Sequence, residues 1–470
     1  MLLLLSYLYL AIPLAIFFTT WLRMPYSLLL LCAIIFPGYI LSKDIKNRRI
    51  AMRPTITGIV IAVLALMWVY YSGSGGFSFQ NGDWSKHNAV LGDLIQYDWP
   101  VRYKIENIGP TYLDYYLGWY TVPAFIGKLT HSLTNAFLTQ YIWTVAGILL
   151  CMRWLKTITK KSSMFLYGFF MMFATADSLG ILILKNTNLL NFITPLEHWS
   201  THEYSSFTTL LYWVPGQGIG VWIVMCALIY MLQQKHAQSF SMWFALLMFW
   251  SPLGFIGMIP FGIYLLFLQI KKGAQNTDFL VHFIPSLFIL FFFFLYYKAN
   301  IFGTLYSQNF RGIWLADSPL MWGRFAVFLF SELLLPLFLI FLLRTYLGAP
   351  LKTLFYIAAP TLIFLPFFHY GLLNDLVMRG SIPSLFVIFL CSYTLLSSKK
   401  VRTKHLYIWL TLIIYFLLGA ITPITEINRS LKSGKNVGIP IHIPQVGDAF
   451  TSQQYQGFGD SFMSKEILKK

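Results

Sequence analysis

Long apolar runs separated by short polar loops dominate this chain. A helix needs roughly 17 to 25 apolar residues to cross a bilayer, so each run of about that length predicts one span. We expect thirteen spans, at residues 1–22, 25–42, 54–71, 133–152, 163–184, 207–232, 240–252, 253–270, 279–298, 322–343, 353–370, 382–397 and 406–423. The pattern therefore predicts an all-α, polytopic membrane protein with about 13 transmembrane helices.

Two of these candidates share the run 240–270, which is too long for one span and short for two. The segment "FWSPLG" splits it, so we expect a helical hairpin or a broken pair that turns at Pro252.

The composition agrees with this class. Only 11% of the residues are charged, against about 25% in soluble domains, and the mean hydropathy is +0.65. The net charge of +17 does not indicate nucleic-acid binding, because the basic residues gather in short loops between apolar runs. All four cysteines fall inside apolar runs and predict no disulfide framework. The first run has no basic leading segment, so we expect it to be retained as a span.

The run 111–128 decides the topology. If it crossed the membrane, the basic loop 153–161 would lie outside; if it lies along the outer face as an amphipathic helix, every strongly basic loop falls on one side. The second arrangement predicts a cytoplasmic amino terminus and an extracytoplasmic carboxyl terminus. Residues 1–423 then form the transmembrane domain with a large outer loop at 72–132, and 424–470 form a short outer tail expected to fold against that loop.

The acidic residues follow the same division. Asp177 and Glu332 lie within predicted spans, and only Asp44 and Asp278 fall in cytoplasmic loops. The remaining acids therefore gather on the outer face. An acid within a span is a functional candidate by default, and a hydrogen bond to a neighbouring helix is the plain alternative.

The richest polar segment follows the third apolar run. After a glycine-rich turn at 73–76, which lets backbone approach a ligand closely, come Asp83, Lys86, His87, Asn88 and Asp93. At about 100° per residue, the two acids, Lys86 and His87 fall within an arc of roughly 120° on one helix face. This predicts an amphipathic helix at the interface; the alternative is a helix that only anchors, with Asp83 as its N-cap.

The second polar group lies in the loop 371–381, with Asn374, Asp375 and Arg379. The acid and the arginine are four residues apart, which predicts a local ion pair. The functional alternative is an arginine presented to a lipid-linked phosphate and held in place by Asp375, because guanidinium donors bind phosphate in pairs.

The third group is in 195–222, where Glu197, His198, His202 and Glu203 precede "PGQGIG". Two histidines four apart are a weak zinc signal without a third ligand, so interfacial polar residues, able to contact sugar hydroxyls, are favoured. The glycine-rich segment is expected to break or loosen its helix.

The fourth group, 309–324, contains Arg311, Asp317 and two tryptophans. Aromatic rings of this kind stack on sugars, but tryptophan also marks any membrane interface, and the interface is favoured.

No Walker A, Rossmann glycine, HExxH or GxSxG motif is present in the sequence, which disfavours ATP-driven transport and soluble nucleotide-sugar chemistry. The segments "GGFSFQNGDWSKHNAVLGDL", "EYSSFTTLLYWVP", "NDLVMRGSIPSLF" and "QYQGFGDSFMSKEIL" resemble those of a poorly characterised bacterial branch of the C-type (GT-C) membrane glycosyltransferases.

The resemblance implies inverting transfer of a sugar from a polyprenyl-phosphate carrier to a lipid, glycan or protein acceptor outside a bacterial cell membrane. It implies Asp83 or Asp93 as the catalytic base, with Asp83 favoured, and Lys86, His87 or Arg379 as stabilisers of the departing phosphate. It names no certain cofactor and leaves a divalent cation open. Two extra spans precede the first large loop, and the adjacent acid pair of the family is missing.

Two other functions stay open: a transporter or flippase for a lipid-linked glycan, and a non-catalytic assembly protein for envelope glycans. A transporter is expected to carry its polar groups near the membrane midplane and to show repeat symmetry. Here the charges lie in outer loops and no repeat is visible.

Overall fold

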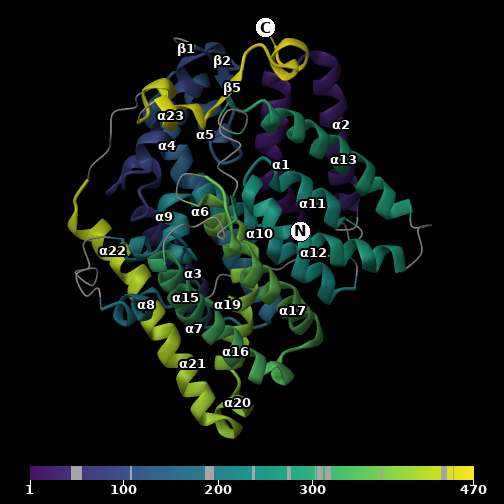
Figure 1. Ribbon diagram of the computed structural model, residues 1–470. Coiled ribbons are helices and arrows are strands. Elements are labelled where there is room, and N and C mark those ends of the chain that lie inside the picture. The colour runs from purple at the N-terminus through teal and green to yellow at the C-terminus, as the bar shows by residue number, and fades with distance from the viewer. Residues whose placement is uncertain are drawn as a thin grey trace.

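The fold is a bundle of helices that carries small sheets made by its loops. The computed structural model describes residues 1–43, 56–105, 108–185, 195–235, 239–271, 277–301, 303, 311–312, 319–371, 374–435, 442–447 and 449–469 (Figure 1). In this part of the chain, 9 helices are long and apolar enough to cross a membrane. Leucine, isoleucine and phenylalanine side chains are exposed along them, as on Phe267 and Phe291 at 60% and 62%. The protein is therefore a polytopic membrane protein.

The spans match most of the expected apolar runs. They are Leu2–Trp21 (α1), Met24–Lys43 (α2), Leu133–Thr159 (α6), Pro215–Gln233 (α10), Pro252–Lys271 (α12), Leu280–Lys298 in α13 (Thr277–Lys298), Trp322–Leu342 in α15 (Pro319–Phe328) and α16 (Leu335–Leu342), Ala349–Phe367 with α17 (Ala349–Phe364), and Leu406–Lys432 with α21 (Leu406–Gly419) and α22 (Ile421–Lys432). Two apolar helices are shorter, α3 (Ile56–Tyr70) and α19 (Ile382–Leu396).

Three expected spans are broken into shorter helices. The run 240–252 contains only the 8-residue helix α11 (Phe240–Leu247), which rises about 12 Å and cannot cross alone, so a separate span there was wrong. The break before α12 falls where "FWSPLG" predicted it. The run 207–232 divides into α9 (Phe207–Trp213) and α10, with Pro215 starting the second helix.

The run 163–184 also does not form one helix. It divides into α7 (Met164–Met171) and α8 (Asp177–Ile183). The backbone groups freed at the break have other partners: the Phe173 carbonyl accepts from Phe207 N–H at 3.0 Å, and Ala176 N–H donates to the Tyr415 hydroxyl at 3.2 Å. Tertiary contacts of this kind let an apolar helix stop inside a bundle.

The expected amphipathic helix over 111–128 was also wrong. That segment contains the end of strand β2 (Gly109–Leu113), an irregular stretch, and then helix α5 (Thr121–Leu129). Within the irregular stretch, Asp114 N–H donates to the Tyr455 carbonyl at 2.9 Å and Gly118 N–H to the Phe249 carbonyl at 3.0 Å. Long-range partners therefore take the backbone bonds that a helix would have made locally.

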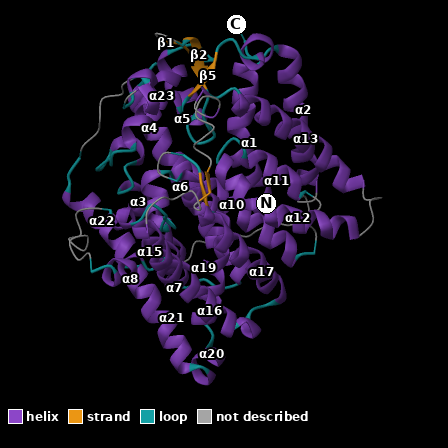
Figure 2. Cartoon of the chain, viewed as in Figure 1, coloured by secondary structure: helices purple, strands orange, loops and turns teal. Residues whose placement is uncertain are grey.

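The carboxyl-terminal tail folds against the first large loop, as expected. Strand β2 pairs with β1 (Arg102–Ile105) on one side and with tail strand β5 (Gln456–Phe458) on the other (Figure 2). Leu468 forms a further bridge to Leu22 at the end of α1. Figure 1 shows this yellow tail, with helix α23 (Ala449–Gln453), lying over α4 (Trp84–Gln96) and the strands. The tail therefore packs together with the first large loop, residues 72–132, as one structural unit.

Asp93 is one of the residues that hold the tail in place. Its carboxylate is 1% exposed and accepts from three partners: His442 Nδ1 at 2.7 Å, Ile443 N–H at 2.9 Å and the Tyr103 hydroxyl at 2.7 Å. A buried carboxylate with three donors is a structural anchor that costs several kcal/mol to remove.

We expect Asp93→Ala to lower the free energy of unfolding by about 3 kcal/mol, because it leaves buried donors without an acceptor. Hydrogen exchange of the tail amides near Ile443 should accelerate most. Asp98→Ala is the matched control, since that carboxylate is fully exposed and its ion pair with Lys128 is long, at 3.8 Å. Equal exchange in the two variants would contradict the anchoring role.

Candidate functional site

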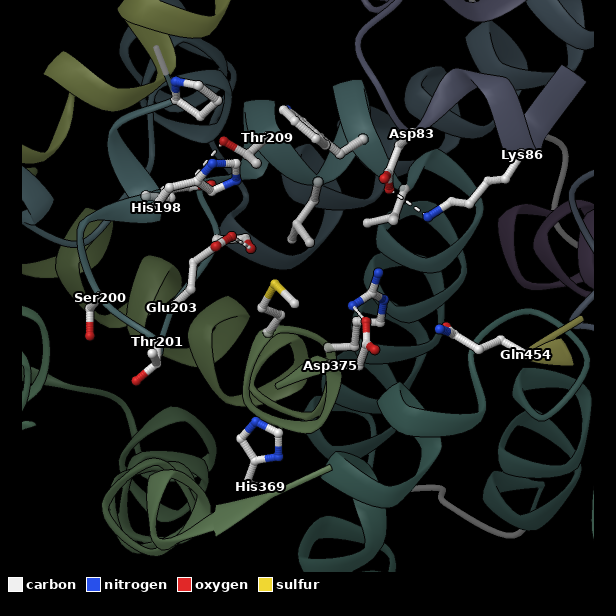
Figure 3. Close-up of a pocket in the computed structure, with 18 of the residues that line it drawn as sticks. Asp83, Lys86, His198, Ser200, Thr201, Glu203, Thr209, His369, Asp375 and Gln454 are labelled. Atoms are coloured by element: carbon white, nitrogen blue, oxygen red, sulfur yellow. Dashed lines mark hydrogen bonds and ion pairs between the residues drawn. The ribbon is translucent and has the colours of Figure 1, made fainter. Parts of the chain in front are cut away.

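A polar cavity of about 590 Å³ lies where five separate segments of the chain meet (Figure 3). The start of α4, the segment 195–214, strand β4 (Phe368–His369), helix α18 (Asp375–Gly380) and the tail residues 451–455 all line it. Its titratable lining residues, apart from Tyr455, are Asp83, Lys86, Glu197, His198, Glu203, His369, Asp375 and Arg379. The cavity is large enough for a sugar with an attached phosphate.

The start of α4 presents Asp83 and Lys86 to this cavity. Asp83 is the N-cap residue of α4, but its side chain makes no capping bond; instead Lys86 Nζ donates to Asp83 Oδ2 at 2.5 Å. The neighbouring Trp84 is buried and its indole N–H donates to the Tyr212 carbonyl at 3.0 Å. This anchor fixes the first turn of α4, so the two charged side chains keep a defined direction.

Asp83 is ionised at neutral pH. Burial alone would raise the pKa of its carboxyl, but the positive charges of Lys86 and Arg379 and the Lys86 hydrogen bond outweigh burial, so the pKa lies below its ordinary value. The side chain is 30% exposed, which leaves it open to a ligand in the cavity.

Helix α18 contributes the second ion pair. Arg379 Nη1 donates to Asp375 Oδ1, which confirms the predicted pairing four residues apart. Burial disfavours the charged guanidinium, but Asp375, Tyr116 and Asp83 favour it more strongly, so the pKa of Arg379 is raised and the side chain stays cationic. Asn374, in the left-handed conformation at φ 61°, turns the chain into this helix and does not line the cavity.

The opposite wall of the cavity carries carboxyl groups that, among the described residues, form no ion pair with a lysine or arginine. Glu197, in the short helix Leu196–Trp199, is buried, and its Oε1 accepts from Ser206 N–H at 2.7 Å and from the Thr209 hydroxyl at 2.9 Å. Burial and the negative charges of Glu203 and Asp177 raise the pKa of Glu197 well above its ordinary value. Figure 3 shows His198, Glu203 and Thr209 across the cavity from Asp83 and Lys86.

The raised pKa of Glu197 predicts a pH-dependent stability. The neutral acid favours folding at low pH, and this contribution is lost as the pH rises through the folded-state pKa. We expect Glu197→Gln to remove the loss of stability that the parent shows as the pH rises through this pKa, measured by thermal unfolding across a pH series. Glu197→Ala, which leaves the Ser206 and Thr209 donors unpaired, should cost about 1–3 kcal/mol at low pH, where the parent side chain is neutral. A Gln variant with the parent's pH profile would contradict a neutral Glu197.

His87 and Asn88 are buried structural residues of α4 outside the cavity lining. His87 Nδ1 lies against the Tyr120 hydroxyl and Nε2 is 2.7 Å from the Trp213 carbonyl. Since that carbonyl can only accept, Nε2 carries the proton and Nδ1 accepts from Tyr120. Burial and Lys86 lower the pKa of His87 to about 4, so the ring is neutral and does not serve as a cation for phosphate. Asn88 Nδ2 donates to Gln80 Oε1 at 2.8 Å.

The remaining candidates divide as follows. Glu203 lines the cavity, whereas the His202 ring packs against Phe325 and Phe328, and burial lowers the pKa of His202 to about 4. The backbone of Arg311, in β3 (Arg311–Gly312), pairs with His369 of the cavity-lining strand β4. Asp317 and Asp44 lie outside the described residues. Among the described residues, no group of three or more His, Cys, Asp or Glu side chains is arranged to hold a metal ion.

The glycine-rich turn at 73–76 serves packing. Gly73 and Gly75 have φ of 90° and 81°, and a Cβ on either would come within 3 Å of a backbone oxygen, that of Phe79 or Phe137. None of the glycines 73, 75 and 76 lines the cavity. The close backbone approach that the sequence indicated is therefore to the protein itself.

The two acids that the sequence placed within predicted spans, Asp177 and Glu332, meet each other. The indole N–H of Trp199 lies 3.1 Å from both Asp177 Oδ1 and Glu332 Oε1. Thr422 donates to Asp177 at 2.8 Å, and Thr175 donates to Glu332 at 3.0 Å. Hydrogen bonds between neighbouring helices, the plain alternative at the sequence level, thus account for both side chains. Trp199 ends the short helix that carries Glu197, so the pair also supports one wall of the cavity.

Sequence reasoning missed four cavity-lining groups: Gln454 and Tyr455 of the tail, His369 of β4 and Trp213 of α9. No periodicity or spacing marks them, because they reach the cavity only through long-range packing. Comparison with known proteins adds no assignment. No protein-family model, curated protein or solved structure matches this chain. Its function therefore has to be argued from the cavity itself.

Proposed function

We propose that the protein is a GT-C-like membrane glycosyltransferase of the bacterial inner membrane, which transfers a sugar from a polyprenyl-phosphate donor to an acceptor outside the cell. The observation that carries the proposal is the meeting of two ion pairs, Asp83–Lys86 and Asp375–Arg379, in one cavity. They come from loops about 290 residues apart, and both loops lie on the predicted outer face.

The donor phosphate fits the cationic partners of these pairs. Lys86 and Arg379 already pair with the carboxylates of Asp83 and Asp375. An incoming phosphate would therefore compete with these carboxylates for the two cations. As Lys86 turns towards the phosphate, Asp83 loses the partner that most lowers its pKa and becomes a better base. Donor binding would thus activate the residue that acts next.

The reaction is an in-line displacement. Asp83 takes the proton of the acceptor hydroxyl while that oxygen attacks the anomeric carbon of the donor sugar. The bond from this carbon to the phosphate oxygen breaks, and the phosphate leaves with the electron pair, stabilised by Lys86 and Arg379. The new glycosidic bond has inverted configuration. Hydroxyls of the acceptor or the sugar bind the wall that carries Glu197, Glu203 and Thr209.

A flippase for a lipid-linked glycan is the second candidate. The same cavity would then hold the glycan phosphate without breaking a bond, and Asp83 would serve only as the partner of Lys86. A neutral carboxamide could not remove a proton but could still accept a hydrogen bond from Lys86, so Asp83→Asn separates the two functions.

The test compares lipid-linked sugars and envelope glycans of a deletion strain with those of its parent. A transferase predicts accumulation of the unused polyprenyl-phosphate sugar and loss of one sugar from a glycan, lipid or protein, and the intact gene restores both. A flippase predicts accumulation of a complete lipid-linked glycan on the cytoplasmic side. Unchanged lipids and glycans in the deletion strain would overturn the proposal.

A further inference from the structure

A second hollow lies on the outside of the bundle, between α1 and α6. It is a groove of about 530 Å³ whose walls are apolar, with Leu5, Leu8 and Ile12 from α1 and Ala146 and Leu150 from α6. The three α1 side chains are 41–44% exposed, so the groove opens towards the lipid that surrounds a membrane protein. It shares no residue with the polar cavity.

The floor of the groove is built from specific contacts. The rings of Tyr9 and Trp143 stack with centroids 4.3 Å apart, and the Tyr9 hydroxyl donates to the Trp143 carbonyl at 3.0 Å. Gly147 lets the helices approach here, since a Cβ at this position would lie 2.5 Å from the Tyr9 hydroxyl oxygen. Nearer the other end, Trp154 Nε1 donates to Ser6 Oγ at 2.8 Å. These bonds hold the two helices at a defined separation and so preserve the groove.

The length of the groove matches one leaflet of a bilayer. Along α6 it runs from Trp143 to Arg153, ten residues, which is about 15 Å at 1.5 Å per residue. The hydrocarbon core of a bilayer is about 30 Å thick, so the groove spans about half of it. A single acyl chain lying parallel to the helices has this length.

The charge at one end of the groove selects the headgroup. Arg153 closes the apolar lining, and the segment 133–161 contains Arg153, Lys156, Lys160 and Lys161 but no acid. Among the described side chains, no carboxylate forms an ion pair with these four residues. A guanidinium at the end of an apolar groove fits a lipid phosphate. The nearby lysines favour a headgroup with a net negative charge over one whose phosphate is balanced by its own cation.

We infer that this groove is a binding site for an anionic phospholipid, with one acyl chain between α1 and α6 and the phosphate on Arg153. The site is independent of the proposed transfer reaction, because the groove and the cavity share no lining residue. The bound lipid bridges the two helices and stabilises their packing on the side away from the tail.

The test is thermal unfolding of the purified full chain in detergent, with phosphatidylglycerol or phosphatidylcholine of equal acyl length added. We expect phosphatidylglycerol to raise Tm by several degrees and phosphatidylcholine to raise it much less. Arg153→Gln should remove at least half of the difference between the two lipids. Arg402→Gln, an exposed arginine of α20 (Lys399–Lys404), is the matched control and should keep it.

A second variant fills the groove without changing its charge. Ala146→Phe should abolish the phosphatidylglycerol effect and keeps the test decisive if Arg153→Gln does not fold. Equal gains from both lipids, or an undiminished gain in either groove variant, would overturn the inference. If inorganic phosphate reproduced the rise in Tm, the site would bind a simple anion and not a lipid. If the protein were a dimer that Ala146→Phe disrupts, the occupant of the groove would be a second copy of the chain.

Discussion

Asp83→Asn is expected to slow sugar transfer by about 10³-fold while leaving the protein folded and inserted. General base catalysis accelerates a reaction by about 10²–10⁴-fold, and an amide cannot take the proton from the hydroxyl of the sugar acceptor. The amide oxygen of this variant would still accept a hydrogen bond from Lys86, so the first turn of α4 should keep its structure. The measurement is transfer of labelled sugar from a synthetic polyprenyl-phosphate donor by protein in vesicles.

The control for this variant is Asp98→Asn, which changes an exposed carboxylate outside the cavity. It should leave the rate within about twofold. Thermal unfolding of all three proteins shows whether a lost rate reflects chemistry or folding. Full activity in a folded Asp83→Asn protein would remove Asp83 from the mechanism and favour the flippase.

The lowered pKa of Asp83 also predicts the acid limb of the rate profile. The carboxylate stays ionised until the pH falls through its folded-state pKa, which lies below the ordinary value of about 3.9. The value of kcat/KM, which reports the free enzyme, should therefore stay constant from neutral pH down to about 5. The stabilisation from the Asp83–Lys86 pair is present over the same range and is lost only on stronger acidification.

Arg379→Ala is expected to lower kcat/KM for the lipid donor by about 10²-fold, because the departing phosphate loses a fixed cation. KM for the acceptor should change little, since in the proposed mechanism Asp83, and not Arg379, contacts the acceptor hydroxyl. Arg379→Lys keeps the charge but not the planar pair of donors, so it should recover only part of the rate. Initial rates with donor and acceptor varied separately give both constants.

Removal of Arg379 also leaves Asp375 without its partner, which is itself expected to lower stability. The double variant Arg379→Ala with Asp375→Ala removes that unpaired charge. It should restore thermal stability without restoring the donor constant. Arg23→Ala, which breaks the ion pair with Glu466 outside the cavity, is the control for ion-pair loss. Equal loss for donor and acceptor would contradict a phosphate role for Arg379.

The local parts of this structure were predictable. Most spans follow from uninterrupted apolar length, and the Asp375–Arg379 pair follows from a four-residue spacing on a helix. Asp93 shows how a shared helix face can mislead. Asp93 lies on the same helical arc as Asp83, but ten residues place it about 15 Å further along the axis, where the tail binds it. Two side chains on the same face of a helix meet only if they are also close along its axis.

The sequence by itself determined a helical membrane protein, the segments that carry its charges, and the Asp375–Arg379 ion pair. Those properties depend on residues a few positions apart, so hydrophobic length and helical spacing decide them. Only the tertiary structure decided that Asp83, Glu197, Arg379 and Tyr455 line one cavity. It also placed β5 beside β2 and opened the groove between α1 and α6. These arrangements depend on packing between segments more than a hundred residues apart, which no local pattern encodes.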